Sequence, residues 1–249
     1  MLGRRGRARL SALVLPALLA ASPAARQAPQ PPQHGRLFPP QDLGLLEAPD
    51  RDEWQKPHQI LDALGVAEAS VVADVGAGSG WFTVRLARRV GPNGLVYAQD
   101  VQPEMLAAIS RRVQREGLAN VRTRLGRGSD PYLPADSFDA ILIVDVVHEI
   151  EDRVSLFANL SRALKPGGSI GVVDFRPGDS GPGPDASERM APEAVEAEAL
   201  KAGLVLKRRE TFLPFQYFLI FGRPAARTSP PASASAPAAA AATARPPKR

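Results

Sequence analysis

Residues 71–81 read Val-Val-Ala-Asp-Val-Gly-Ala-Gly-Ser-Gly-Trp, and the rest of the chain is organised around them. The first five residues form a short apolar, β-branched run that is typical of a buried parallel strand. Glycines follow at positions 76, 78 and 80, and residues 82–90 then have helical periodicity. Strand, glycine turn and helix form the opening unit of a nucleotide-binding α/β domain. The glycines let backbone amides approach a ligand closely, and the helix N-terminus attracts an anionic group.

The spacing of the glycines separates two classes of ligand. A dinucleotide fingerprint is Gly-x-Gly-x-x-Gly, whereas these glycines alternate as Gly-x-Gly-x-Gly, with Trp81 where the last dinucleotide glycine would fall. Asp74 precedes them at the end of the strand. The pattern Asp-x-Gly-x-Gly-x-Gly resembles motif I of the class I S-adenosylmethionine (SAM)-dependent methyltransferases.

Three later segments resemble the same family, in the order and at the spacing that the family uses. Residues 96–106 resemble the segment that follows motif I. Leu-Pro-Ala-Asp-Ser-Phe-Asp (133–139) resembles the entry to the fourth strand, and Arg-Ala-Leu-Lys-Pro-Gly-Gly (162–168) resembles the turn before the fifth. The resemblance covers residues 54–221 and is nearest to the ubiquinone/menaquinone C-methyltransferase-like group of small-molecule methyltransferases.

The alternation of strands and helices over residues 50–222 predicts an α/β fold. Such alternation favours a parallel sheet with helices on both faces. The last two strands have no helix between them, so we expect them to form an antiparallel final hairpin. The predicted fold is a Rossmann-like, seven-stranded, mostly parallel sheet, as in class I methyltransferases. The expected strands are 71–75, 95–99, 121–125, 140–144, 169–175, 204–212 and 216–221, and the main helices are 54–64, 82–90, 103–116, 153–164 and 192–202.

Three segments lie outside this domain. Residues 1–25 resemble a secretory signal peptide, because four arginines precede the apolar run 10–21 and a Ser-Pro-Ala cleavage site. Residues 26–49 are rich in Pro and Gln and predict a linker. Residues 223–249 are mostly Ala, Pro, Ser and Thr and predict a disordered tail. The signal favours an exported, periplasmic protein; the alternative is a cytoplasmic protein with a start placed too far upstream.

The amino-acid composition indicates which classes of ligand and partner to expect. The chain has no cysteine, and its three histidines lack ligand spacing, so we expect no metal. Residues 50–222 contain 20 Lys or Arg and 24 Asp or Glu, so the net charge of +5 comes from the flanks. Because nucleic-acid binding needs a basic domain face, we expect no nucleic-acid partner. The apolar run 10–21 is too short to span a bilayer, so we expect no stable membrane anchor. The oligomeric state stays open.

The resemblance implies SAM as the cofactor and assigns residues to it. Asp100, at the end of the second strand, would bind the ribose hydroxyls, and Val101 would pack on the adenine. Many relatives carry Gly-Asp after the third strand, where the carboxylate accepts from the adenine amino group. Here that place reads Gly126-Arg127, and the next acid is Asp130, which also fits a simple turn. The residues that would line the methionine portion are Asp74, Gly76, Gly78, Ser79 and Gly80.

Asp145, His148 and Glu149 follow the fourth strand, at the edge where open α/β sheets bind ligands. They are the candidate catalytic residues, because a small-molecule acceptor that loses a proton needs a base such as His or a carboxylate. The alternative is that Asp145 and His148 cap and brace the helix near Arg153. The function predicted is in-line methyl transfer from SAM to a small molecule. The rival functions are a non-catalytic binding module of the same fold and a nicotinamide-dependent oxidoreductase.

The N-terminal pattern makes one direct prediction. If residues 1–25 are a signal peptide, the mature protein should begin near Ala24 and fractionate with exported proteins, because signal peptidases cut after small residues. N-terminal sequencing of the protein recovered from fractionated cells measures this. An uncleaved cytoplasmic chain would contradict export.

Overall fold

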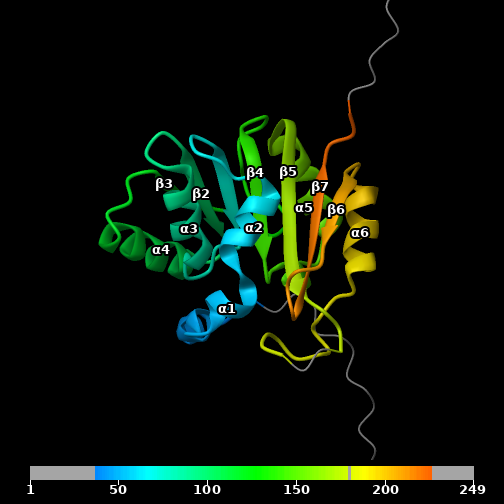
Figure 1. The fold of residues 1–249 in the computed structure, drawn as a ribbon, viewed down its shortest axis with the longest axis horizontal. Helices are drawn as coiled ribbons and strands as arrows, with labels where there is room; N and C mark the ends of the chain where they lie inside the picture. The colour runs from blue at the N-terminus through cyan, green and yellow to red at the C-terminus, as the bar shows by residue number, and fades with distance from the viewer. Residues whose placement is uncertain (1–36, 179–180, 226–249) are drawn as a thin grey trace, which may run out of the picture. The chain divides into compact units, whose positions relative to one another are not determined.

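A seven-stranded sheet forms the centre of the domain (Figure 1). The computed structural model describes residues 37–178 and 181–225; the expected signal peptide, residues 26–36 of the linker and most of the tail lie outside the described residues. The strand order is β3-β2-β1-β4-β5-β7-β6, with β1 to β5 parallel and β7 antiparallel to both neighbours. The predicted mostly parallel sheet with a final antiparallel hairpin is confirmed. The strands are β1 (Val71–Val75), β2 (Leu95–Asp100), β3 (Val121–Leu125), β4 (Phe138–Val144), β5 (Leu164–Phe175), β6 (Val205–Glu210) and β7 (Gln216–Gly222).

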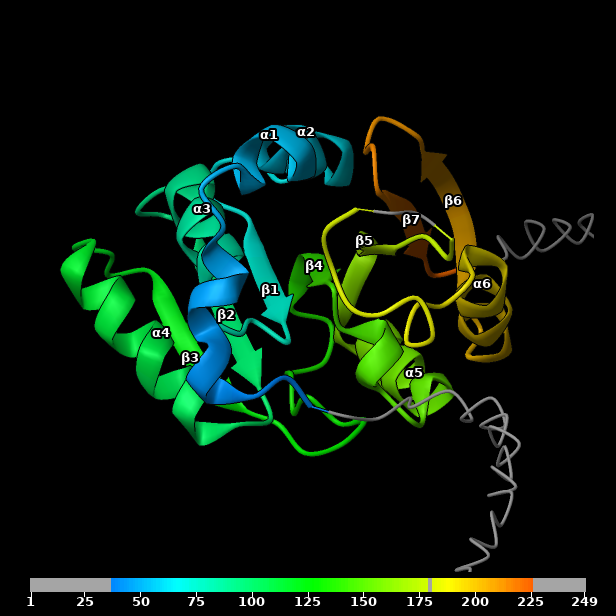
Figure 2. The same ribbon diagram turned by 90° about the horizontal axis from the view of Figure 1, so that it is seen from below.

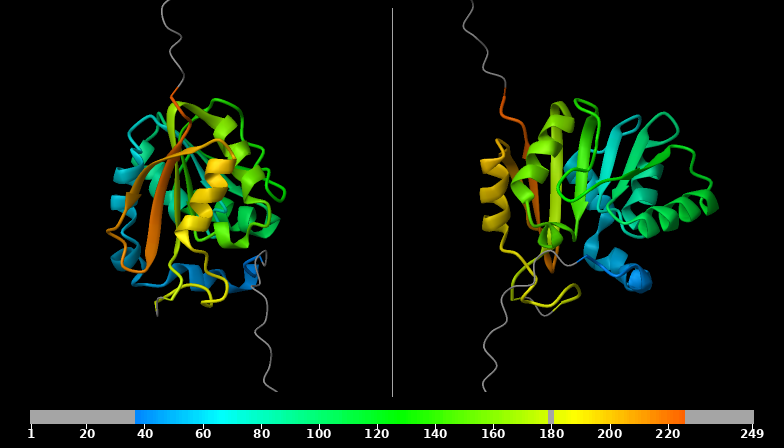
Figure 3. Two further views of the ribbon diagram at one scale, coloured as in Figure 1. Left: turned by 90° about the vertical axis from the view of Figure 1, so that its right-hand side faces the viewer. Right: turned by 180° about the vertical axis from the view of Figure 1, so that it is seen from behind.

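Helices cover both faces of the sheet, as the edge-on view shows with cyan α2 on one side and yellow α6 on the other (Figure 3). One apolar layer joins the sheet to α2 and α3, and the opposite layer joins it to α5 and α6. This division follows from right-handed crossovers, because the strand order runs outward in opposite directions from the β1–β4 pair. The helices are α1 (Arg51–Gln55), α2 (Pro57–Leu64), α3 (Trp81–Val90), α4 (Pro103–Arg115), α5 (Arg153–Ala163) and α6 (Pro192–Lys201), with 3-10 helices η1 (Pro40–Glu47) and η2 (Val147–Glu149).

The N-terminal part of the domain differs from the expectation. The helix expected at 54–64 is two helices, because Lys56 adopts a left-handed conformation with φ 47°. The following Pro57 disfavours the α-helical conformation at Lys56, so α1 ends there and α2 starts in a new direction. The described part of the expected linker also holds structure, since η1 lies within it and packs on the domain.

The glycine turn after β1 is fixed by both its backbone and its neighbours. Gly76 has φ 69°, and a Cβ built on it would lie 2.4 Å from the Cγ2 atom of Val146. Glycine is therefore required here on two independent grounds, the left-handed backbone and the contact with the segment after β4.

Replacing this glycine tests the turn. Gly76→Ala should lower the free energy of unfolding by about 1–3 kcal/mol, because it adds backbone strain and a clash. Gly44→Ala in η1 is the matched control, since nothing lies within 4 Å of its added Cβ. Urea unfolding followed by circular dichroism measures both variants. Equal stability of the two variants would contradict the requirement.

Candidate functional site

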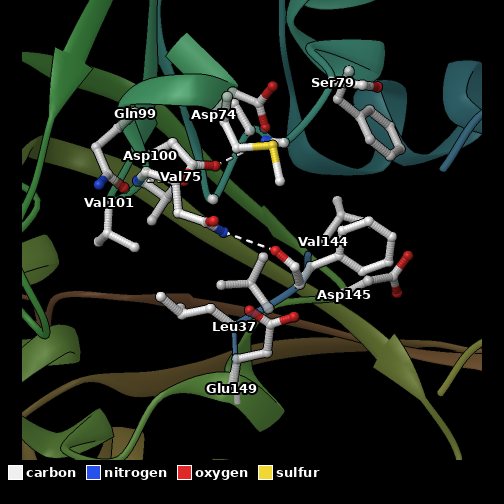
Figure 4. A pocket seen from close by; sticks show the side chains of 18 of the residues that line it. Leu37, Asp74, Val75, Ser79, Gln99, Asp100, Val101, Val144, Asp145 and Glu149 are labelled. Carbon is white, nitrogen blue, oxygen red and sulfur yellow. Dashed lines mark hydrogen bonds between the residues drawn. The ribbon is translucent and has the colours of Figure 1, made fainter. Parts of the chain in front are cut away.

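A pocket lies at the carboxyl ends of β1, β2 and β4, where the strand order reverses. Open α/β sheets bind ligands at this switch point. The cavity has a volume of about 110 Å³, and its walls are mostly apolar. Figure 4 shows Asp74 and Asp100 toward one end of the pocket and Asp145 and Glu149 toward the other.

Asp100 ends β2 and is held in one orientation. Its Oδ2 atom accepts from the backbone N–H of Gly78 at 2.9 Å, and its Oδ1 atom accepts from the N–H of Gln102 at 3.0 Å. The side chain is buried, and this burial raises its pKa above the usual value. Each carboxylate oxygen has a second lone pair, so Asp100 can accept two further hydrogen bonds from a ligand diol.

Asp74 and the glycine turn form the neighbouring wall. Asp74 is buried and accepts from the hydroxyl of Thr83 at 2.6 Å. Burial raises its pKa from 3.8 to about 6, although the Thr83 hydrogen bond opposes this shift. Gly76, Gly78 and Ser79 also line the pocket. The structure thus brings Asp74, Gly76, Gly78 and Ser79 together in one wall of the pocket.

Asp145 lies at the end of β4 inside a closed network of side chains. Its Oδ1 atom accepts from Nε2 of Gln216 at 2.5 Å, and its Oδ2 atom accepts from Nε2 of Gln55 at 3.2 Å. The Gln55 amide also donates to Oε1 of Gln216 at 3.1 Å, and the Arg51 guanidinium lies 3.6 Å from Oδ2 of Asp145. Burial raises the pKa of Asp145, although the charge of Arg51 opposes this. Asp145 also has φ 58°, a left-handed conformation that the network holds in place.

Glu149 faces the pocket, whereas His148 faces the protein interior. Burial raises the pKa of Glu149 from 4.5 to about 7, opposed by the charge of His148 and by the backbone N–H of Phe38. The Nδ1 atom of His148 lies 3.0 Å from Oδ2 of Asp174, which is fully buried on β5. Burial alone would lower the pKa of His148, but the hydrogen bond and charge of Asp174 raise it from 6.5 to about 9. The pair braces η2, the segment that carries Glu149.

Some residues proposed from the sequence lie away from the cavity. The residues that line it include Asp145, Glu149 and Val101, but not His148, Gly80 or Asp130. Asp130 closes a turn, where its Oδ1 atom accepts from the N–H of Tyr132 at 2.8 Å. Its place in the pocket wall is taken by Gly128 and Pro131.

The structure adds pocket residues that the sequence did not indicate. Four come from the segment before β1, and the other three lie at the end of β2 or just after it. No motif marks the first four, because they reach the pocket through tertiary contacts, whereas the other three lie within residues 96–106 but were not assigned to the site. They are Leu37, Phe38, Leu46, Arg51, Gln99, Gln102 and Met105.

In residues 37–178 and 181–225, no group of three or more His, Asp or Glu side chains is arranged to hold a metal ion. Within the same residues, no helix has the length and hydropathy to cross a bilayer.

Comparison with known proteins agrees with this geometry. Residues 72–168 match a methyltransferase domain family. The chain is 32% identical to nocamycin O-methyltransferase of Saccharothrix syringae, over 56% of this chain and 52% of that protein. It is 31% identical to the ubiquinone/menaquinone biosynthesis C-methyltransferase UbiE of a Marinomonas species, over 49% of this chain and 48% of that protein. The chain thus spans about half the length of these curated relatives.

One solved structure aligns with this chain over nearly its own whole length. A SAM-dependent methyltransferase from Aquifex aeolicus superimposes with a TM-score of 0.71 at 28% identity, covering 74% of this chain and 98% of that one. The fold and the site define a Rossmann-like methyltransferase domain. These sequence and structure matches support the class I SAM-dependent methyltransferase family for this chain.

The shifted pKa values of Glu149 and His148 make the free energy of unfolding depend on pH. Glu149 has a raised pKa, so its contribution to stability is present below 4.5 and is lost as pH rises through about 7. His148 also has a raised pKa, so its contribution is present below 6.5 and is lost as pH rises through about 9. The free energy of unfolding should therefore fall between pH 5 and pH 9.

Two variants separate these contributions in urea unfolding measured across that range. Glu149→Gln should remove its own part of the fall between pH 4.5 and 7, on the order of 2 kcal/mol, and leave the parts that come from the raised pKa values of Asp74 and Asp145. His148→Gln should remove the fall between pH 6.5 and 9. Glu151→Gln, at an exposed position nearby, is the control and should follow the wild type. A Glu149→Gln profile that is parallel to the wild type would contradict the assignment.

Proposed function

We propose that this chain binds SAM in the pocket and transfers its methyl group to a hydroxyl oxygen of a small, largely apolar acceptor. The observation that carries the proposal is the charge pattern of the pocket. Four carboxyl groups and a single guanidinium line it, namely Asp74, Asp100, Asp145, Glu149 and Arg51. SAM has a ribose diol, an ammonium, a sulfonium and one carboxylate, so it complements this pattern.

The residues also fit SAM by position. Asp100 is oriented to accept from both ribose hydroxyls, in agreement with the role that its place after β2 predicts. Asp74 supplies negative charge for the ammonium beside the glycine turn. Gly76 and Gly78 lie in the same wall, where the absent side chains leave room for the methionine portion.

Asp145 is the candidate base. Bound SAM supplies an electrophilic methyl group, so the acceptor oxygen forms the new C–O bond as the C–S bond breaks and S-adenosylhomocysteine (SAH) leaves. The hydroxyl proton passes to the Asp145 carboxylate, which both glutamine amides hold in position. Its raised pKa brings it nearer to neutrality, where a general base is most effective. Glu149 is the second carboxylate within the pocket, and His148 positions it through η2.

The pocket walls support an apolar acceptor, and some relatives act on oxygen. Two relatives are named as O-methyltransferases, of nocamycin and of the 3′′ position of erythromycin, whereas the ubiquinone/menaquinone relative is named as a C-methyltransferase. Leu37, Phe38 and Ile150 line the pocket beside Glu149. Apolar walls exclude water from the transfer, which prevents hydration of the base.

The full-length protein tests the proposal. Calorimetry should detect SAH binding and no NAD binding. A panel of phenols and aliphatic alcohols incubated with SAM should yield SAH together with a product that carries one added methyl group on oxygen. Asp145→Asn should lower kcat by about 10²–10⁴-fold, because the carboxylate that accepts the proton is lost.

Asp136→Asn is the matched control, since Asp136 is exposed and pairs with Arg223 away from the pocket. It should retain wild-type kcat. Binding of NAD without SAH would contradict the cofactor, and SAH binding without turnover of any acceptor would favour a non-catalytic binding module. A product methylated on carbon would overturn the oxygen assignment alone.

A further inference from the structure

Arg51, on α1, is the single cation among the described residues that line the pocket. Its side chain is buried and its guanidinium lies 4.3 Å from the centre of the Trp81 ring. The Nε atom donates to Oε1 of Gln55, and one terminal nitrogen donates to the backbone carbonyl of Leu46. The other terminal nitrogen lies 3.6 Å from Asp145, too far for a hydrogen bond.

This arrangement leaves a buried cation with unused donors at the pocket. A guanidinium has five N–H groups in a planar fork that matches a carboxylate. Burial lowers the pKa of Arg51, because a charged guanidinium is less stable away from water. The negative charge of Asp145 opposes that shift. An anionic group in the pocket would therefore be bound at Arg51, because the other charged groups in its wall are carboxyls.

Arg51 also holds the segment that covers the pocket, which we name the strap and define as residues 37–47. Figure 2 shows this blue segment crossing the ends of β1 and β2. Phe38 is held from both sides, since Nε2 of Gln102 donates to its carbonyl at 3.0 Å and its N–H donates to Glu149. At the other end, Arg112 pairs with Glu47 and Arg51 binds the carbonyl of Leu46.

The strap is closed in this structure. The remaining cavity of about 110 Å³ is smaller than the roughly 300–1,000 Å³ of most ligand pockets. Leu46 lies over the glycine turn, with its Cδ1 atom 3.2 Å from a Cβ built on Gly78. A nucleoside-sized ligand therefore enters when the strap moves, and Arg51 is the strap contact that also carries free donors toward the ligand.

We propose that Arg51 binds the carboxylate of the cofactor's amino-acid end and couples cofactor binding to closure of the strap. This inference rests on the proposed function, because it takes SAM as the ligand. Arg51 would then recognise the carboxylate with its unused terminal donors while its bond to Leu46 holds the strap down. Ligands that lack the carboxylate would bind without this closure.

A matched pair of ligands tests the first part. SAH and 5′-S-(3-aminopropyl)-5′-thioadenosine differ by the carboxylate alone, so calorimetry with both isolates its contribution. Arg51→Met should weaken SAH binding by about 10- to 100-fold, the effect of losing a charge-assisted hydrogen bond. The same variant should change binding of the decarboxylated analogue by less than about threefold. Arg51→Lys should restore part of the loss, because it keeps the charge without the fork.

Arg85→Met is the control for the stacking on Trp81. Arg85 lies 3.4 Å from the same ring centre, but it pairs with Asp52 and is absent from the pocket wall. It should leave the affinity ratio of the two ligands unchanged. An equal loss of both ligands in Arg51→Met would overturn the inference while leaving SAM as the cofactor. Failure of the wild type to bind either ligand would overturn the proposed function itself.

Amide hydrogen exchange tests the second part. At saturating ligand, SAH should slow exchange over residues 37–47 of the wild type more than the decarboxylated analogue does. In Arg51→Met the two ligands should protect these residues equally. Equal protection by both ligands in the wild type would overturn the coupling.

Discussion

The hydrogen bonds around Asp145 join three segments that are distant in the sequence. Gln55 comes from α1, Asp145 from the end of β4 and Gln216 from the start of β7. A buried carboxylate is costly unless donors satisfy it, so each glutamine amide is needed for the others to stay buried. This network fixes α1 against the sheet edge. It thereby fixes Arg51, and through Arg51 the strap, which makes the N-terminal segment a wall of the pocket.

The acid groups of the pocket differ in their hydrogen-bond donors. Both carboxylate oxygens of Asp100 accept hydrogen bonds from backbone N–H groups, at the place proposed for the ribose diol. Asp145 receives neutral amides and faces a cation that is too far to form a hydrogen bond. Glu149 has one backbone donor, the N–H of Phe38, beside the apolar wall formed by Leu37, Phe38 and Ile150. Burial raises the pKa of all three, but the fixed donors of Asp100 suit it to binding, whereas the other two suit proton transfer.

The sequence predicts the sheet and the cofactor half of the site because their signals are local. The run from Val71, the alternating glycines and the position of Asp100 each follow from neighbouring residues. Most strands and helices lie close to their expected bounds, but β5 begins at Leu164, five residues before its expected start. The break at Lys56 was missed although Pro57 marks it. Hydrophobic periodicity continues across the break, so pattern alone favoured one helix.

The strap and the Asp145 network were missed for a different reason. Pro and Gln dominate residues 26–49, and composition of that kind indicates a linker unless tertiary contacts hold it. Those contacts come from Gln102, Arg112 and Glu149, which no local pattern connects to Phe38 or Glu47. Likewise, nothing near Gln216 in the sequence indicates that its amide binds a carboxylate 71 residues away.

The family model matches residues 72–168, so it contains some of the groups at the pocket and not others. The matched domain, residues 72–168, contains the glycine turn, Asp100, Asp145 and Glu149. Arg51 and Gln55 precede it, and Asp174 and Gln216 follow it. Three groups around Asp145 (Arg51, Gln55 and Gln216) therefore lie outside the matched domain, whereas three groups that hold the strap (Gln102, Arg112 and Glu149) lie within it.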